Sequence, residues 1–134
     1  MLGIDLGGKR TGLAFADTLS GLVIPIEVLH ASEGQELDSA LDHAIREHGP
    51  HRLVIGLPLN MDGTEGPAAQ KSRAMGEALQ QRHGVPVEYQ DERLTSFAAE
   101  ADLVERKLNR RAKKNVADAH AAAEILRDWL AEQS

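Results

Sequence analysis

The sequence contains no cysteine in its 134 residues. This absence excludes a disulfide framework and a zinc site built from thiolates, and it is usual in cytosolic proteins. Aromatic residues make up only 3% of the chain. So few aromatic side chains argue against a nucleic-acid-binding module that works by stacking bases.

Long hydrophobic runs are also missing. No segment approaches the roughly 18 consecutive apolar residues that a membrane span requires. The N-terminal residues enter a strand pattern directly, without the basic region and cleavable apolar segment of a secretory signal. We therefore expect a cytoplasmic protein without a membrane segment, folded as a single domain over residues 1–134.

The chain has no overall excess of positive charge, because its net charge is −6. Its basic residues are nevertheless concentrated in residues 106–114, RKLNRRAKK, which hold six basic side chains and no acidic one. Without these six charges the rest of the chain carries −12. The segment is thus a basic arm on an acidic body. It is either a solvated loop or a contact surface for phosphates. In the second case the contacts would come from Arg110, Arg111, Lys113 and Lys114.

Hydrophobic periodicity predicts an α/β fold. Alternating apolar residues indicate three successive strands, with a turn at Gly7-Gly8 after the first, and the later segments alternate between helix and strand. This order predicts a mixed five-stranded sheet, with a three-strand antiparallel meander plus two parallel strands, flanked by helices. The expected strands are residues 2–6, 11–16, 22–29, 53–57 and 85–89, and the expected helices are residues 33–48, 67–83, 97–107 and 117–131.

An acidic residue, Asp5, interrupts the apolar pattern of the first strand. Burial of a carboxylate is unfavourable unless the charge is paired or coordinates a metal. The favoured explanation is a divalent cation, and the basic residues Lys9 and Arg10 that follow the Gly-Gly turn are then placed to bind a phosphate. The alternative is a purely structural role for Asp5.

Two further acidic residues are candidates for the same site. Glu92 follows the last strand, where α/β sheets commonly carry their sites, and Asp118 is expected in the first turn of the last helix. Small residues line one face of the first two strands and of that helix, so close packing would bring Asp118 near Asp5. Clustered carboxylates repel one another, and Mg²⁺ or Mn²⁺ would relieve this repulsion. In the plainer reading, Asp118 stabilises a helix N-terminus and Glu92 pairs with Arg93 in a turn.

Two other polar residues lie close to these motifs. His120 follows Asp118 by two residues, where it either assists a metal or a proton transfer or simply lies on the helix surface. Asp62, in NMDGTEG, is either a ligand or a residue that forms the turn at Gly63. For both residues the plainer, structural reading is favoured.

Four motifs together carry a family resemblance. GIDLGGKRTGLAFAD, VIGLPLNMDGTEG, DERLTS and KKNVADAHAAAEIL occur in this order between residues 3 and 126, and they resemble the YqgF family, which is also called RuvC-like. The resemblance implies an RNase H-like fold and a metal-dependent nuclease. In bacteria the family is associated with maturation of the 5′ end of the 16S ribosomal RNA precursor. It was first described as a Holliday junction resolvase by analogy with RuvC.

The resemblance also assigns roles to residues. The family's acidic site falls on Asp5, Glu92 and Asp118, which would hold Mg²⁺ or Mn²⁺, and its basic turn falls on residues 8–10. With Arg93 and the basic arm, this turn is expected to hold the flanking phosphates. In an RNase H-like sheet the fourth strand lies nearest the first. Glu92 follows the fifth strand and is therefore expected to reach the metal only through a loop adjustment or with substrate bound.

Three interpretations compete on this basis. The first is a two-metal nuclease in which water attacks a phosphodiester of precursor ribosomal RNA without a covalent enzyme intermediate. The second keeps this chemistry on a four-way DNA junction, where paired cuts require two active sites and hence a homodimer, whereas the RNA interpretation allows a monomer. The third is a different class of protein: an RNA-binding module without activity, or a phosphate loop like that of sugar kinases and actin-like ATPases, which need two such domains.

Overall fold

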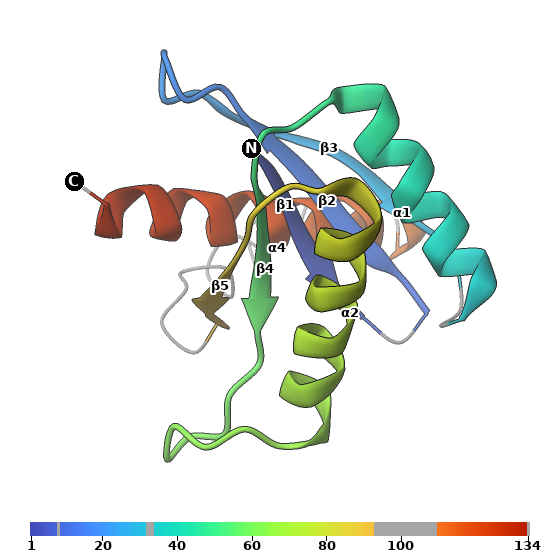
Figure 1. Ribbon diagram of the computed structural model, residues 1–134, viewed down its shortest axis with the longest axis vertical. Coiled ribbons are helices and arrows are strands. Elements are labelled where there is room, and N and C mark those ends of the chain that lie inside the picture. Colours follow the sequence, from blue (N-terminus) through green and yellow to red (C-terminus); the bar gives the residue numbers. More distant parts are fainter. Residues whose placement is uncertain (8, 32–33, 93–109, 134) are drawn as a thin grey trace.

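The computed structural model of the chain describes residues 1–7, 9–31, 34–92 and 110–133, and the side chains of residues 110–118 fall outside this description. In the described part, five strands form one mixed sheet in the order β3-β2-β1-β4-β5. Helices α1 and α2 cover one face of this sheet, and α4 crosses the other face (Figure 1). The predicted fold class, an antiparallel meander plus two parallel strands flanked by helices, is confirmed.

The antiparallel meander consists of β1 (Leu2–Leu6), β2 (Thr11–Ala16) and β3 (Val23–Leu29). β1 pairs with β2 along its whole length and ends at the pair Leu6↔Thr11, so residues 7–10 connect the two strands. A Cβ at Gly7 would collide with the carbonyl oxygen of Arg10. The path of this connection therefore requires glycine at position 7.

The parallel part of the sheet and its two helices follow as α1 (Gln35–His48), β4 (Leu53–Leu57), α2 (Pro67–His83) and β5 (Val87–Asp91). These bounds lie within two residues of the predicted ones. β5 begins and ends two residues later than expected, because its pairing with β4 continues to Leu57↔Asp91 although Gln90 and Asp91 break the apolar pattern. Backbone pairing with the neighbouring strand, rather than side-chain hydrophobicity, extends β5.

Each face of the sheet has its own hydrophobic core. Beneath α1 and α2, large aliphatic side chains such as Leu2, Ile4 and Leu41 are fully buried. The core under α4 contains many small side chains, among them Ala14 and Ala122. The two cores therefore differ in how closely a helix can approach the sheet, and α4 packs on the face with the smaller side chains.

The C-terminal helix α4 (Arg110–Glu132) is longer than predicted. The sequence suggested a start near Ala117, after the basic arm, but residues 110–114 of that arm form the first turns of the helix. Arginine, lysine and alanine favour the helix, so the basic run continues the helical pattern instead of ending it. Asp118 therefore lies more than two turns inside α4, and the interpretation that it stabilises a helix N-terminus is wrong.

The predicted helix over residues 97–107, together with residues 106–109 of the basic arm, lies outside the described residues. In the part of the chain that is described, no helix combines the length and the apolar character needed to cross a membrane.

Candidate active site

Asp5 lies on the face of β1 that α4 covers. Along β1, Leu2 and Ile4 enter the core beneath α1 and α2, so the alternating residues Gly3 and Asp5 face the other side of the sheet. Asp5 is half-buried and is paired across the strands with Gly12 of β2. Because glycine has no side chain, the sheet surface beside Asp5 is not filled from the β2 side.

Glu92 follows β5, but its side chain extends over β4. A Cβ at Gly56 of β4 would lie 2.8 Å from Glu92 Cδ and would collide with Oε1, so the carboxylate occupies the space of a side chain at position 56. The parallel register of β1 and β4 runs to Ile4↔Ile55, and one step further along both strands places Gly56 beside Asp5. Glu92 thus lies over β4, the strand that separates β5 from β1. That Glu92 reaches a metal at Asp5 only through a loop adjustment or with substrate bound stays a prediction.

Helix α4 crosses the sheet obliquely (Figure 1), and its last turn reaches β5, where Gln90 Nε2 donates a hydrogen bond to Glu132 Oε1 at 3.1 Å. Its later part lies at the start of β1, because Trp129 shares a core with Met1 and its ring centroid lies 5.1 Å from the guanidinium carbon of Arg52. The middle of α4 lies at Gly3, where a Cβ would be 2.9 Å from the carbonyl oxygen of Ala122. The earlier turns of α4 therefore lie toward β2 and β3, on the same face of the sheet as Asp5.

The backbone position of Asp118 follows from that of Ala122. Asp118 lies one turn before Ala122, and Asp5 lies two residues after Gly3. The backbone of Asp118 is therefore one helical turn away from a residue that contacts β1. The close approach of α4 to the small residues of the sheet, which the sequence predicted, is confirmed.

The basic candidates in the described residues belong to two elements. Lys9 is exposed and Arg10 is half-buried in the connection that follows β1. The arm residues Arg110, Arg111, Lys113 and Lys114 belong to the first turns of α4. The last of these four precedes Asp118 by one turn. Arg93, and with it the proposed pairing to Glu92, lies outside the described residues.

Local structure accounts for Asp62, and His120 lies away from the face of α4 that carries Asp118. Two residues of helix turn by about 200°, so His120 lies on the opposite side of α4 from Asp118 and does not share its face. Asp62 Oδ1 accepts hydrogen bonds from the backbone N–H of Thr64 at 3.0 Å and from its hydroxyl group at 2.6 Å. Gly63, between them, has a φ of 89°. Asp62 therefore forms the turn, as the plainer reading expected.

The donors at the end of β1 fit a hard divalent cation in their chemistry. Carboxylate oxygens are preferred ligands of Mg²⁺ and Mn²⁺, and the absence of a side chain at Gly56 leaves the space that the Glu92 carboxylate occupies. Among the residues whose side chains are described, no three His, Asp or Glu form a metal-binding group. Asp118 is not among those residues.

Gly56 is the position that the sequence patterns did not reveal. It interrupts a strand that is buried along its whole length. A glycine inside a strand commonly marks the close approach of another group, and the sequence contains that signal in VIGLP. The signal does not show which group approaches, because Glu92 comes from a different strand.

The architecture is similar to that of solved RuvC-like structures. “T. thermophilus RuvC in complex with Holliday junction substrate” matches with a TM-score of 0.62 and 17% identity, covering 99% of this chain and 94% of that chain. “Crystal structure of Fowlpox virus resolvase and substrate Holliday junction DNA complex” matches with a TM-score of 0.53 and 10% identity, covering 91% and 94%. At these identities the likeness establishes the fold, which is RuvC-like and hence RNase H-like.

The family follows from the sequence. The model of the RuvX family, described as “Holliday junction resolvase”, matches residues 1–132. A protein of Anaeromyxobacter sp. (strain K) is 46% identical over 130 residues, covering 96% of this chain and 94% of its own. One of Lactobacillus delbrueckii subsp. bulgaricus is 42% identical over 137 residues, covering 97% and 94%. Both are named “Putative pre-16S rRNA nuclease”. The chain belongs to the RuvX family, also called YqgF, and the resemblance seen in the motifs is confirmed.

Proposed function

We propose that this protein is a cytoplasmic, metal-dependent nuclease, a single domain that hydrolyses phosphodiester bonds by a two-metal mechanism. The observation that supports the proposal is the Glu92 carboxylate over Gly56, which comes next to Asp5 when the parallel register of β1 and β4 is extended by one residue. Asp118 belongs to α4, one turn before Ala122, whose carbonyl oxygen lies at Gly3. Membership of the RuvX family over residues 1–132 supports it independently.

In the proposed mechanism Asp5, Glu92 and Asp118 hold Mg²⁺ or Mn²⁺. When bound, the ions stabilise the charge that develops on the phosphate and lower the pKa of the water that attacks it. Asp5 is paired with Gly12 of β2, and the residue before it, Ile4, is also paired with β4, so the strand fixes the backbone that carries Asp5. Glu92 is confined over Gly56 together with Ile125 of α4, which restricts the orientation of its carboxylate.

In this proposal the basic residues bind the substrate, while the acidic residues hold the metal ions. Lys9, Arg10 and Arg93, together with the basic arm at the start of α4, bind the phosphates that flank the cleaved bond. They act through charge, without reading the base sequence. Binding is therefore expected to weaken steeply with salt.

We propose the 5′ end of the 16S ribosomal RNA precursor as the substrate. The names of relatives at 46% and 42% identity, “Putative pre-16S rRNA nuclease”, support this assignment. A four-way DNA junction is the second candidate, favoured by the description of the RuvX family and by a fold neighbour in complex with such a substrate. Paired cuts in a junction require a homodimer with two active sites, whereas RNA processing requires only a monomer.

The test is Mn²⁺-dependent cleavage of two labelled substrates side by side, a precursor 16S RNA end and a mobile four-way DNA junction. We expect the wild-type protein to cut the RNA and Asp5→Asn to be inactive while still binding it, because the substitution removes a metal ligand and no phosphate contact. Calorimetric titration with Mn²⁺ should show weaker binding to Asp5→Asn. Unchanged turnover or unchanged metal binding would refute the site. Paired nicks in the junction alone, made by a dimer, would establish the resolvase instead.

A further inference from the structure

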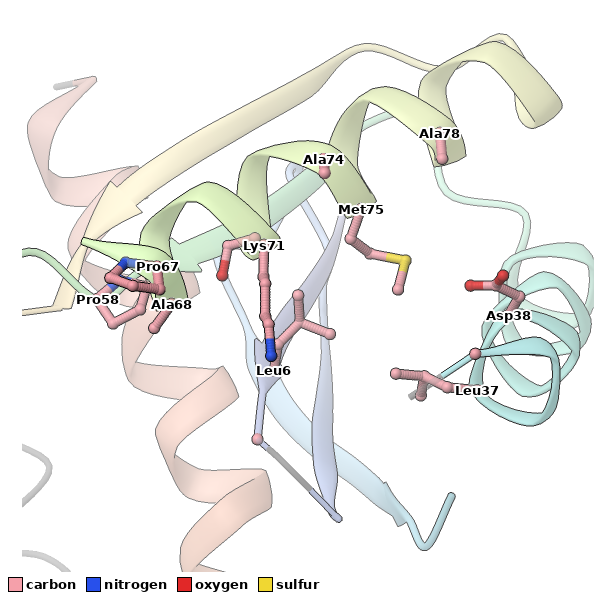
Figure 2. Close-up of a pocket in the computed structure, with 13 residues that line it drawn as sticks. Leu6, Leu37, Asp38, Pro58, Pro67, Ala68, Lys71, Ala74, Met75 and Ala78 are labelled. Carbon is pink, nitrogen blue, oxygen red and sulfur yellow. The ribbon is translucent and has the colours of Figure 1, made fainter. Parts of the chain in front are cut away.

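A cavity of about 690 Å³ lies on the face of the sheet opposite to the proposed active site. It opens between α1 and α2, at the ends of β1 and β4 (Figure 2). Its volume falls within the range of about 300–1,000 Å³ that is typical of ligand sites. The mechanism proposed above makes no use of this cavity.

The cavity exists because α2 presents small side chains toward α1. The alanines in its wall are Ala68, Ala74 and Ala78. One turn beyond the cavity the two helices are tied together by Asp42 of α1, whose Oδ1 accepts hydrogen bonds from Arg82 Nε at 3.0 Å and from His83 Nε2 at 2.7 Å. These hydrogen bonds join α1 to α2 next to the cavity.

Opposite charges stand on opposite walls of the cavity. Lys71 extends from α2 toward Leu6, while Asp38 points from α1 toward α2 (Figure 2). Pro67, the first residue of α2, also lines the cavity. The first turn of α2 contains no acidic residue, and its N-cap, Gly66, makes no side-chain hydrogen bond. The positive end of the helix dipole therefore adds to the charge of Lys71.

The remaining lining is largely apolar and includes Leu6, Leu37, Pro58 and Met75. The chemistry of this lining matches the parts of a ribonucleotide. It offers a cation, a helix N-terminus, a carboxylate and an apolar surface. The phosphate is an anion, the ribose hydroxyl groups donate hydrogen bonds to carboxylates, and the base has apolar faces.

The cavity and the proposed active site adjoin along the chain at the end of β1. Asp5 alternates with Leu6, which lines the cavity on the other face of the sheet. Gly7 lines it as well and begins the connection that carries Lys9 and Arg10. A polynucleotide strand bound at Asp5 can therefore reach the cavity by passing around this basic connection.

We propose that this cavity holds one nucleotide of a single-stranded RNA substrate next to the cleavage site. Lys71 and the backbone N–H groups of the first turn of α2 after Pro67 bind its phosphate, Asp38 accepts a hydrogen bond from the 2′-hydroxyl group, and Leu37 and Met75 contact the base. The proposal rests on the proposed function, because the strand is the substrate of that nuclease.

The first test compares Lys71→Gln with Arg46→Gln, both in the Asp5→Asn background so that the RNA stays intact. Arg46 is a basic residue in the last turn of α1 that does not line the cavity, so both variants change the net charge equally. By fluorescence anisotropy with a short single-stranded RNA, we expect Lys71→Gln to weaken binding about tenfold and to reduce the salt slope by about 0.7, the value for one phosphate contact. Arg46→Gln should bind like its parent. Equal binding by the two variants would overturn the proposal.

Two further substitutions test whether the cavity volume is needed for RNA binding and whether Asp38 recognises the 2′-hydroxyl group. Ala74→Leu fills the cavity without a change of charge and should weaken binding, whereas Ala131→Leu, at an exposed position near the end of α4, should not. Asp38→Asn should reduce the preference for RNA over DNA of the same sequence by several fold. An unchanged preference, or equal effects of the two leucines, would contradict the assigned contacts.

The remaining outcomes separate this proposal from the proposed function. Cleavage that is lost in Asp5→Asn, combined with RNA binding that is indifferent to Lys71, would leave the nuclease standing and reject the cavity. If the protein binds RNA through Lys71 but does not cut it, the cavity assignment stands and the nuclease proposal is rejected. Adenosine 5′-monophosphate is the last probe. If it binds as tightly as the RNA and with the same dependence on Lys71, the cavity is a free-nucleotide site and the strand assignment is wrong.

Discussion

Gly56 lies beneath both Glu92 and Ile125. A Cβ at this position would be 2.5 Å from Ile125 Cδ1 and would collide with Glu92 Oε1. One position in β4 thus affects two properties, the packing of α4 on the sheet and the placement of a proposed metal ligand. The two properties can be separated by substitution, because Ile125 is a packing residue and Glu92 is not.

We expect Gly56→Ala to impair both properties. Overpacking against Ile125 should lower the free energy of unfolding by about 1–3 kcal/mol, measured by urea denaturation. Displacement of Glu92 by about 1 Å should reduce the rate of RNA cleavage by about 100-fold, measured in single turnovers at a temperature where the variant is folded.

The double variant Gly56→Ala/Ile125→Val is the control. Valine lacks Cδ1, so this variant should recover part of the lost stability while its cleavage rate stays low. If cleavage returned together with stability, the loss would come from packing, and the role assigned to Gly56 in positioning Glu92 would be wrong.

At the scale of whole elements, Asp42 joins α1 to α2. Its side chain is 21% exposed and accepts hydrogen bonds from Arg82 and His83. Burial raises the pKa of the Asp42 carboxyl group, but the hydrogen bonds from His83 and Arg82 lower it by more, and the pKa lies below its ordinary value of 3.8. The charged form is therefore favoured by folding. Its contribution to stability is complete above the unfolded pKa and is lost as the pH falls through the folded pKa.

We expect Asp42→Asn to lower the free energy of unfolding by about 1 kcal/mol at neutral pH. The difference from wild type should persist down to about pH 4 and vanish in stronger acid, where Asp42 is protonated in both states. Urea denaturation across this range measures it. Glu47→Gln, on the same helix, is the matched control, because Glu47 and His43 lie 3.4 Å apart with side chains 58% and 76% exposed. A similar loss in both variants would show that Asp42 does not join the helices.

The elements differ in how far the sequence predicted them. The alternation of Leu2 and Ile4 with Asp5 was sufficient to assign the two faces of β1, and the order of strands and helices was sufficient for the sheet. The start of α4 was not predictable, because arginine and lysine suit both a solvated loop and a helix. The path of Glu92 was not predictable either, because it depends on which residue of the neighbouring strand stands in its way. Only the three-dimensional register identifies that residue as Gly56.

Across the whole molecule the charges are segregated. The chain carries −6, and the rest of it carries −12 once residues 106–114 are set aside. Residues 110–114 lie on α4, the helix that also carries Asp118. The basic residues and a proposed metal ligand are therefore on one rigid element, so a phosphate bound by the first turns of α4 is held in a fixed relation to the site.

We expect neutralisation of Arg110, Arg111, Lys113 and Lys114 by glutamine to weaken RNA binding and to flatten its dependence on salt by about 0.7 per lost phosphate contact. Binding isotherms of the Asp5→Asn background at several salt concentrations measure this slope. Arg46→Gln, on α1, again provides the value for the loss of one positive charge on another element. A slope that does not change would mean that these residues do not touch phosphate.

The face of the sheet that receives α4 carries small residues, among them Gly3, Ala14 and Ala16. During synthesis these residues leave the ribosome long before α4, so the face stays uncovered while the other core can already form. Glycine and alanine expose little apolar side-chain area. The uncovered face therefore offers little hydrophobic surface for association with other chains. The small residues that let α4 approach closely thereby also limit aggregation of the nascent protein before its last helix arrives.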